Sequence, residues 1–140
     1  MILVDASILT DFLLGRPQAL AALQRELVGR EQEPLHAPEL VEPETLNALR
    51  RLAISGAITD QRASEAAADL ANTRLIRYPH APLRARVWDL RHSLTAYDAT
   101  YLALAEAFAD PVLLTGDGGL AARARNSLGS ERVRHVQQPD

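Results

Sequence analysis

Short apolar runs alternate along the chain with longer segments whose apolar residues recur at helical spacing. Uninterrupted apolar runs bounded by turn-forming residues are typical of buried strands, whereas apolar residues three or four positions apart are typical of helices. The first pattern predicts strands over residues 1–4, 35–37, 74–78, 111–114 and 132–136. The second pattern predicts helices over residues 7–14, 19–28, 39–55, 61–72, 83–92, 97–108 and 118–127.

This alternation predicts an α/β fold. Parallel strands need helical crossovers that cover both faces of the sheet, so we expect three layers around a parallel sheet of four or five strands. Residues 97–108 are apolar almost all round, which predicts a helix buried on every side. Pro43 lies early in the helix over residues 39–55, where we expect it to kink the first turn.

The length of 140 residues corresponds to a single domain over residues 1–140. The absence of cysteine excludes disulfides, thiolate zinc sites and cysteine nucleophiles, and it is typical of a reducing cytoplasm. No apolar run approaches the roughly 20 residues that cross a bilayer. No basic segment precedes the first apolar stretch, so we expect no signal peptide, no membrane and a cytoplasmic location.

The charge and the residue types of the chain exclude several classes of protein. A net charge of −3 argues against nucleic-acid binding through bulk positive charge, so any such contact is local or acts through a metal ion. All 15 basic residues are arginine, and a chain without lysine cannot carry a P-loop. The four histidines share no ligand spacing, no G-x-S-x-G segment is present, and the glycines at 116–119 do not form a dinucleotide fingerprint.

Four carboxylates each stand beside a predicted strand end or helix start: Asp5, Glu44, Asp98 and Asp117. The carboxyl ends of parallel strands lie at one edge of the sheet, where open α/β sheets bind ligands. Carboxylates crowded together need a neutralising partner, and a divalent cation that prefers oxygen ligands is suited to that role. The four residues therefore predict a Mg²⁺ or Mn²⁺ site and phosphate chemistry.

Each carboxylate also has a purely structural alternative. Asp5 and Asp117 are placed to cap the helices that follow them, and Thr95 with Asp98 has the pattern of a capping box. Glu44 is placed as an ordinary acidic residue of a first helical turn. Glu39 and Glu42 compete with Glu44. The side chains of Glu42 and Glu44 point in different directions around the helix, so they cannot both reach one site. One metal site accounts for all four carboxylates together, so we favour it.

Neighbouring residues are candidates for supporting roles. Ser7 is placed to orient Asp5 or a metal-bound water, and Thr115 is placed to hydrogen-bond a ligand carboxylate. Arg50 and Arg51 follow Glu44 on the same predicted helix, where they are candidates for contacts with phosphate oxygens. Tyr97, Tyr101 and Trp88 are expected in the core or an interface rather than stacked on bases.

Four segments together resemble PIN-domain nucleases, in the order that family has them. Val4-Asp5-Ala6-Ser7 resembles the family's opening V-D-[TA]-S, and residues 37–51 resemble the segment that carries its glutamate, with Glu44 at that position. Residues 95–105, TAYDATYLALA, are very similar to the Y-D-A-x-Y-[LV]-A-L-A segment of VapC-type toxins. Residues 114–120 resemble their T-x-D-x-x-L segment, with Gly118-Gly119 where an Arg or Lys is common, and Pro43 before Glu44 is a second departure.

This resemblance implies a PIN fold and a Mg²⁺- or Mn²⁺-dependent endoribonuclease. It further implies the toxin of a type II toxin–antitoxin pair, a homodimer silenced by a small antitoxin, with Asp5, Glu44, Asp98 and Asp117 as the acidic quartet. Two alternatives stay open at this point. A receiver-like signalling domain also has acidic strand ends but uses a lysine, which this chain lacks. The other alternative is a catalytically inactive PIN-like binding module, which a calorimetric metal titration separates from the enzyme, because a competent quartet should bind Mn²⁺.

Overall fold

Five parallel strands form one sheet at the centre of the protein, which we describe from a computed structural model over residues 1–137. The strand order is β3-β2-β1-β4-β5, and every neighbouring pair is parallel. The strands are β1 (Ile2–Val4), β2 (Leu35–Pro38), β3 (Leu75–Tyr78), β4 (Val112–Thr115) and β5 (Val133–His135). The predicted parallel sheet is confirmed, with five strands. Residues 138–140 of the predicted domain lie outside the described part.

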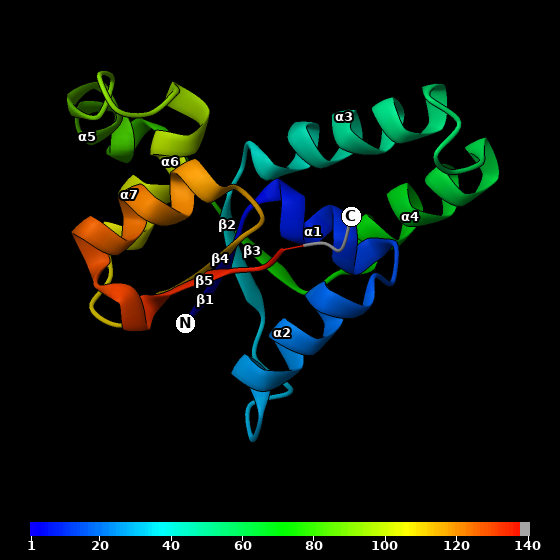
Figure 1. Ribbon diagram of the computed structural model, residues 1–140, viewed down its shortest axis with the longest axis horizontal. Coiled ribbons are helices and arrows are strands. Elements are labelled where there is room, and N and C mark those ends of the chain that lie inside the picture. Colours follow the sequence, from blue (N-terminus) through cyan, green and yellow to red (C-terminus); the bar gives the residue numbers. More distant parts are fainter. Residues whose placement is uncertain (138–140) are drawn as a thin grey trace.

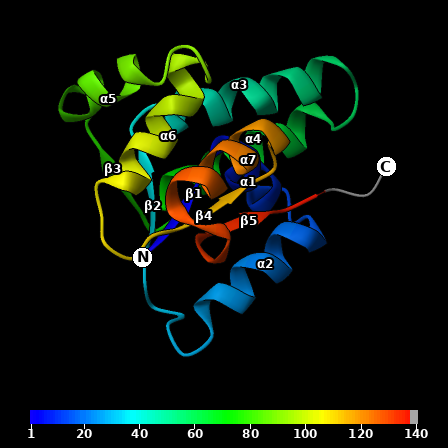
Figure 2. The same cartoon turned by 60° about the vertical axis from the view of Figure 1, so that its left-hand side comes forward.

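Helices cover both faces of the sheet and complete the three predicted layers (Figure 1; Figure 2). One face carries α1 (Ala6–Leu13), α2 (Pro17–Leu27), α3 (Val41–Ile54) and α4 (Asp60–Asn72). The other face carries α5 (Arg84–Asp89), α6 (Ala96–Glu106) and α7 (Gly118–Leu128). Short 3₁₀ turns, η1 (Ala81–Leu83) and η2 (Ser130–Arg132), precede α5 and β5. The α/β/α architecture is therefore confirmed.

The chain begins in the middle of the sheet and changes direction once. It runs outward from β1 through β2 to β3, then crosses back to place β4 on the other side of β1. In the β1–β4 pair, Leu3 lies opposite Leu113 and Val4 opposite Leu114, so Asp5 and Thr115 leave the sheet side by side. Such a reversal of strand order opens a crevice outside the carboxyl ends of the strands. The topology therefore places a crevice at Asp5.

Strand β1 and helix α6 are deeply buried in the core. All three residues of β1 are buried, and so are the seven residues Ala99–Ala105 of α6. The prediction of a helix buried on every side is confirmed over these residues. Its ends emerge into solvent, because Tyr97 is 65% and Phe108 is 38% exposed. The first turn of α6, which carries Asp98, therefore reaches from the core to the surface.

Two local expectations differ from the structure. The helix predicted over residues 83–92 is shorter, because a 3₁₀ turn with Pro82 in it precedes α5, and α5 ends at Asp89. Pro43 does not interrupt α3, which is continuous from Val41 to Ile54. Pro43 is the third residue of α3, where a backbone N–H has no partner within the helix in any case. The next residue, Glu44, donates its N–H to Leu40 O at 3.2 Å.

Across residues 1–137, none of the helices combines the length and the apolar character that crossing a bilayer requires. The longest helix, α3, has 14 residues.

Candidate active site

A hollow of about 630 Å³ lies at the carboxyl edge of the sheet and contains all four predicted carboxylates in its wall. We call it the acidic cleft. Helices α1, α3 and α6 and the loop after β4 contribute to it. Its lining residues include Asp5, Ser7, Arg16, Glu44, Asn47, Arg51, Asp98, Tyr101 and Asp117. The topology thus brings together residues that are more than a hundred positions apart in the sequence.

Asp5 is held rigidly at the base of the cleft. It is 6% exposed and is the N-cap of α1, where Oδ1 accepts the Ile8 N–H at 3.0 Å. Ser7 Oγ donates to the same oxygen at 2.5 Å, and Thr115 Oγ1 donates to Oδ2. The helix-cap alternative for Asp5 is therefore correct as geometry. The Asp5 carboxylate can still bind a further ligand, because its two oxygens offer about four acceptor positions.

Glu42 and Glu44 of α3 have different surroundings. Glu42 forms an ion pair with Arg77 of β3, away from the cleft. Glu44 points into the cleft, where Tyr101 Oη donates a 2.6 Å hydrogen bond to Glu44 Oε1. Glu44 is thus the glutamate that lies with the other carboxylates.

Asp98 and Asp117 are both attached to helix starts. Thr95 is the N-cap of α6 and accepts the Asp98 N–H at 3.2 Å, which is half of the predicted capping box. Asp117 is the N-cap of α7, and its Oδ1 accepts the Leu120 N–H at 2.8 Å. The Asp98 carboxylate itself has no hydrogen bond or ion pair within residues 1–137. It is half-buried and faces three other acidic side chains without compensation.

Burial and mutual repulsion perturb the ionisation of these groups. Desolvation, reinforced by Asp117, Asp5 and Glu44, raises the pKa of Asp98 to about 6. Desolvation also raises the pKa of Asp5 despite the hydrogen bonds from Ser7 and Thr115. The pKa of Glu44 is raised by burial, against the lowering effect of the Tyr101 hydroxyl. A raised pKa at several facing carboxylates means that the cleft disfavours its own negative charge.

The donor set of the cleft suits a hard divalent cation. The four predicted carboxylates line it, and oxygen is the donor that Mg²⁺ and Mn²⁺ prefer. Within residues 1–137, no three His, Cys, Asp or Glu side chains already converge tightly enough to hold a metal ion as a group. Mg²⁺ does not require such a cage, because it commonly keeps several waters and takes one or two carboxylates plus substrate phosphates. The residues present therefore fit that ion.

Several residues of the cleft were not singled out from the sequence. Tyr101 is 2% exposed, as expected of a core residue, yet its hydroxyl also holds Glu44. The sequence does contain a signal for this role, because Tyr101 follows Asp98 by three residues and so lies on the same side of the helix. Arg16 and Asn47 also line the cleft. Of the two predicted phosphate-contact arginines, Arg51 lines the cleft, while Arg50 is exposed and is not among the lining residues.

Comparison with known protein families identifies the fold. The model of the PIN domain family matches residues 2–126. The chain belongs to the PIN domain family. This PIN domain is 41% identical over 120 residues to Ribonuclease VapC1 of Mycobacterium tuberculosis, covering 85% of this chain and 87% of that protein. It is 43% identical over 120 residues to VapC ribonuclease Mb0985 of Mycobacterium bovis, covering 84% and 86%.

A third relative of this PIN domain is Ribonuclease VapC12 of Mycobacterium tuberculosis, at 35% identity over 121 residues, covering 86% of this chain and 90% of that protein. The resemblance inferred from the four segments is thereby confirmed. The receiver-like alternative is wrong, because the match to the PIN family extends over most of the chain.

The perturbed carboxylates predict an unusual dependence of stability on pH. A carboxylate whose pKa is raised on folding stabilises the fold fully below its unfolded pKa, and this contribution is lost as pH rises through the folded pKa. For Asp98 that window lies between about 4 and about 6. In the metal-free protein we therefore expect Asp98 to favour folding at about pH 4 and to have lost this stabilising contribution by about pH 7.

His36 works in the opposite direction, since burial lowers its pKa and acid then destabilises the fold. The measurement is therefore a comparison of melting temperatures between the wild type and Asp98→Asn in EDTA. Both proteins contain His36, so its contribution to the pH dependence cancels. The gap in melting temperature between the two proteins should widen from about pH 4 to about pH 7, with Asp98→Asn the more stable. A gap that does not change with pH would show that ionisation of Asp98 does not destabilise the fold.

Proposed function

We propose that this PIN domain is a Mg²⁺- or Mn²⁺-dependent endoribonuclease that hydrolyses RNA phosphodiester bonds. The proposal rests on the Asp98 carboxylate, which is half-buried beside Asp5, Glu44 and Asp117 and has no cationic partner within residues 1–137. Crowded carboxylates of this kind require a divalent ion for charge balance. The three relatives named above are all VapC ribonucleases, which supports RNA as the substrate.

Asp5, Glu44, Asp98 and Asp117 would hold the ion, directly or through its waters. The chemistry that such an ion supplies when bound is activation of a water and neutralisation of phosphate charge. Ser7 and Thr115 fix the two oxygens of Asp5, and Tyr101 fixes Glu44, so these two carboxylates are preorganised. Water is the expected nucleophile, and the expected products carry 5′-phosphate and 3′-hydroxyl ends.

Arginines at the mouth of the cleft supply the substrate contacts of this proposal. Arg51 lies on α3 beyond Glu44, and Arg16 lies at the start of α2, next to Asp11 at 3.5 Å. A guanidinium binds phosphate oxygens with two parallel hydrogen bonds. Arg50, exposed one position before Arg51, is a further candidate for a longer RNA. These contacts are local, as an acidic protein requires.

The proposal includes the biological setting that VapC relatives suggest. The domain would act in the cytoplasm as the toxin of a type II toxin–antitoxin pair, in a homodimer silenced by its cognate antitoxin. Large exposed apolar side chains on α5 and α6, Trp88 at 66% and Tyr97 at 65% exposure, are compatible with protein partners. In this proposal residues 1–140 form a single domain.

The direct test is incubation of the purified protein with total RNA, with and without Mg²⁺, followed by mapping of the RNA ends. Metal-dependent cleavage that leaves 5′-phosphates supports the nuclease. Absence of cleavage at any metal concentration, with metal binding intact, would instead identify a PIN-like binding module.

Replacing Tyr101 by Phe tests the support of Glu44. The ring and its packing stay, and only the hydroxyl that donates to Glu44 Oε1 is lost. We expect cleavage or Mn²⁺ affinity to fall by about 10- to 100-fold, because residues that orient metal ligands have effects of this size. The measurements are a Mn²⁺ titration and the rate of RNA cleavage at several Mn²⁺ concentrations. Tyr97→Phe, on the exposed side of α6, is the matched control and should behave as the wild type.

A further inference from the structure

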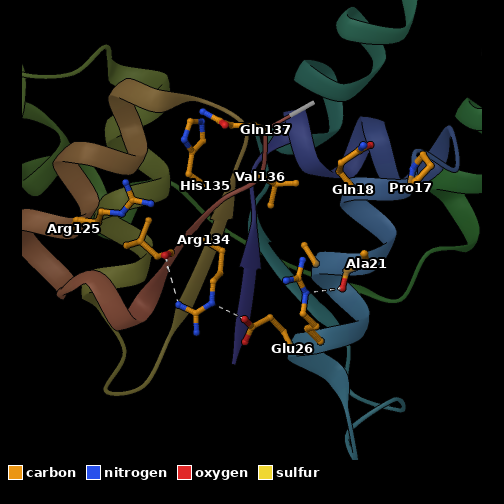
Figure 3. Close-up of a pocket in the computed structure, with 12 residues that line it drawn as sticks. Pro17, Gln18, Ala21, Glu26, Arg125, Arg134, His135, Val136 and Gln137 are labelled. Carbon is orange, nitrogen blue, oxygen red and sulfur yellow. Dashed lines mark hydrogen bonds and ion pairs between the residues drawn. The ribbon is translucent and has the colours of Figure 1, made fainter. Parts of the chain in front are cut away.

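A second hollow, of about 660 Å³, lies between α2, the edge strand β5 and α7 (Figure 3). We call it the basic groove and define it by Gln18, Arg25, Glu26, Arg125, Arg134 and His135. β5 is the outermost strand on its side of the sheet, so the groove runs along an open edge. None of these residues belongs to the acidic cleft.

Positive charge dominates this groove although the whole chain has a net charge of −3. Three arginines and one glutamate line it, which leaves a local charge of +2 with His135 neutral. Arg134 Nε is paired with Glu26 Oε1 at 2.7 Å, as Figure 3 shows. Arg25 and Arg125 have no carboxylate partner within residues 1–137. The groove is therefore suited to an anionic ligand with more than one charge.

The basic groove adjoins the acidic cleft at two places. Gly116 donates its N–H to Ser7 Oγ in the cleft at 2.9 Å, and its carbonyl oxygen lies 3.3 Å from His135 Nε2 in the groove. Arg16 lines the cleft and the next residue, Pro17, lines the groove. The cleft and the groove are therefore neighbours, separated by Gly116 on one side and by the step from Arg16 to Pro17 on the other.

We propose that the basic groove binds the RNA strand on one side of the bond that is cut, with Arg25 and Arg125 on its backbone phosphates. This inference rests on the proposed ribonuclease function. RNA carries one phosphate per nucleotide, so a strand held in the cleft presents further anions to the adjoining groove. Proteins that bind single strands use such positively charged tracks along the backbone. An acidic polypeptide would match the charge but has no such connection to the cleft.

Arg25 and Arg125 are positioning residues in this scheme, since they lie outside the cleft. They should lower KM for RNA long enough to fill the groove and leave kcat unchanged. A very short RNA that occupies only the cleft should be cut equally well with or without them. That dependence on RNA length is a readout that a merely structural role would not give.

The test uses two double variants that remove the same number of charges. Arg25→Gln/Arg125→Gln alters the groove, and Arg84→Gln/Arg123→Gln alters two exposed arginines outside it. Both are made in Asp98→Asn protein, and binding of a fluorescent RNA of about 12 nucleotides is measured by anisotropy in EDTA over a range of salt. We expect about tenfold weaker binding for the groove variant and a salt slope shallower by about 1.4, for two phosphates lost. Equal affinity in both double variants would overturn the proposal.

Two further arms separate the possible failures. Metal-dependent cleavage by the wild type tests the nuclease independently, so an active enzyme with a groove variant of unchanged KM refutes the groove alone. A polyglutamate peptide in place of RNA tests the other anionic polymer. If the peptide binds in an Arg25- and Arg125-dependent manner and RNA does not, the groove is a protein docking site and our proposal is wrong.

Discussion

Asp98→Asn is expected to abolish RNA cleavage, with a fall of at least about a hundredfold, and to leave the fold intact. The substitution keeps the shape of the side chain and removes one anionic oxygen from the site that would hold the cation. The Asp98 backbone N–H still bonds Thr95, so α6 keeps its N-terminal cap. Cleavage is measured with total RNA and Mn²⁺, and circular dichroism checks the fold.

The same variant should be more stable than the wild type in EDTA. The raised pKa of Asp98 shows that its charge is disfavoured by burial and by the three facing carboxylates, so a neutral amide relieves a cost. The favourable effect of an anion near a helix N-terminus is already outweighed, because the pKa rises rather than falls. Asp69→Asn, exposed on α4, removes the same charge elsewhere and controls for net charge. Lower stability together with full activity would contradict the assignment.

Removal of divalent cations should have an equally large effect. We expect EDTA to reduce RNA cleavage by at least about a hundredfold and Mn²⁺ or Mg²⁺ to restore it, because four facing carboxylates otherwise repel an RNA phosphate. Cleavage is followed on a defined RNA while the ion is added back.

A matched control separates coordination from charge screening. Spermidine supplies positive charge without accepting carboxylate oxygens as ligands, so it should not restore cleavage. Full recovery with spermidine, or undiminished cleavage in excess EDTA, would mean that the carboxylates serve another purpose.

The sequence predicted the arrangement of elements because its signals are local. Three kinds of signal depend only on neighbours in the chain: the apolar run before Asp5, the mostly apolar segment over residues 99–105, and the caps at Thr95 and Asp117. Parallel pairing then follows from the alternation of strands and helices. The convergence of Asp5, Asp98 and Asp117 on one edge of the sheet could be predicted from the same local signals.

Contacts between distant elements could not be predicted in this way. Glu42 and Glu44 have similar local settings, and only the position of Arg77 on β3 and of Tyr101 on α6 separates their roles. The bond from Thr115 to Asp5 spans 110 positions and depends on the β1–β4 register. The basic groove likewise depends on α2 lying opposite an edge strand from the end of the chain. Sequence spacing carries no information on these distances.

The central claim is that Asp5, Glu44, Asp98 and Asp117 act together as the site of one divalent cation or a closely spaced pair. Calorimetric titration of the metal-free protein with Mn²⁺ tests it most directly, alongside Asp98→Asn and the control Asp69→Asn. We predict saturable binding to the wild type and to Asp69→Asn, release of protons near neutral pH, and at least about tenfold weaker binding to Asp98→Asn. Binding of equal strength in all three proteins, or none in the wild type, would contradict the account.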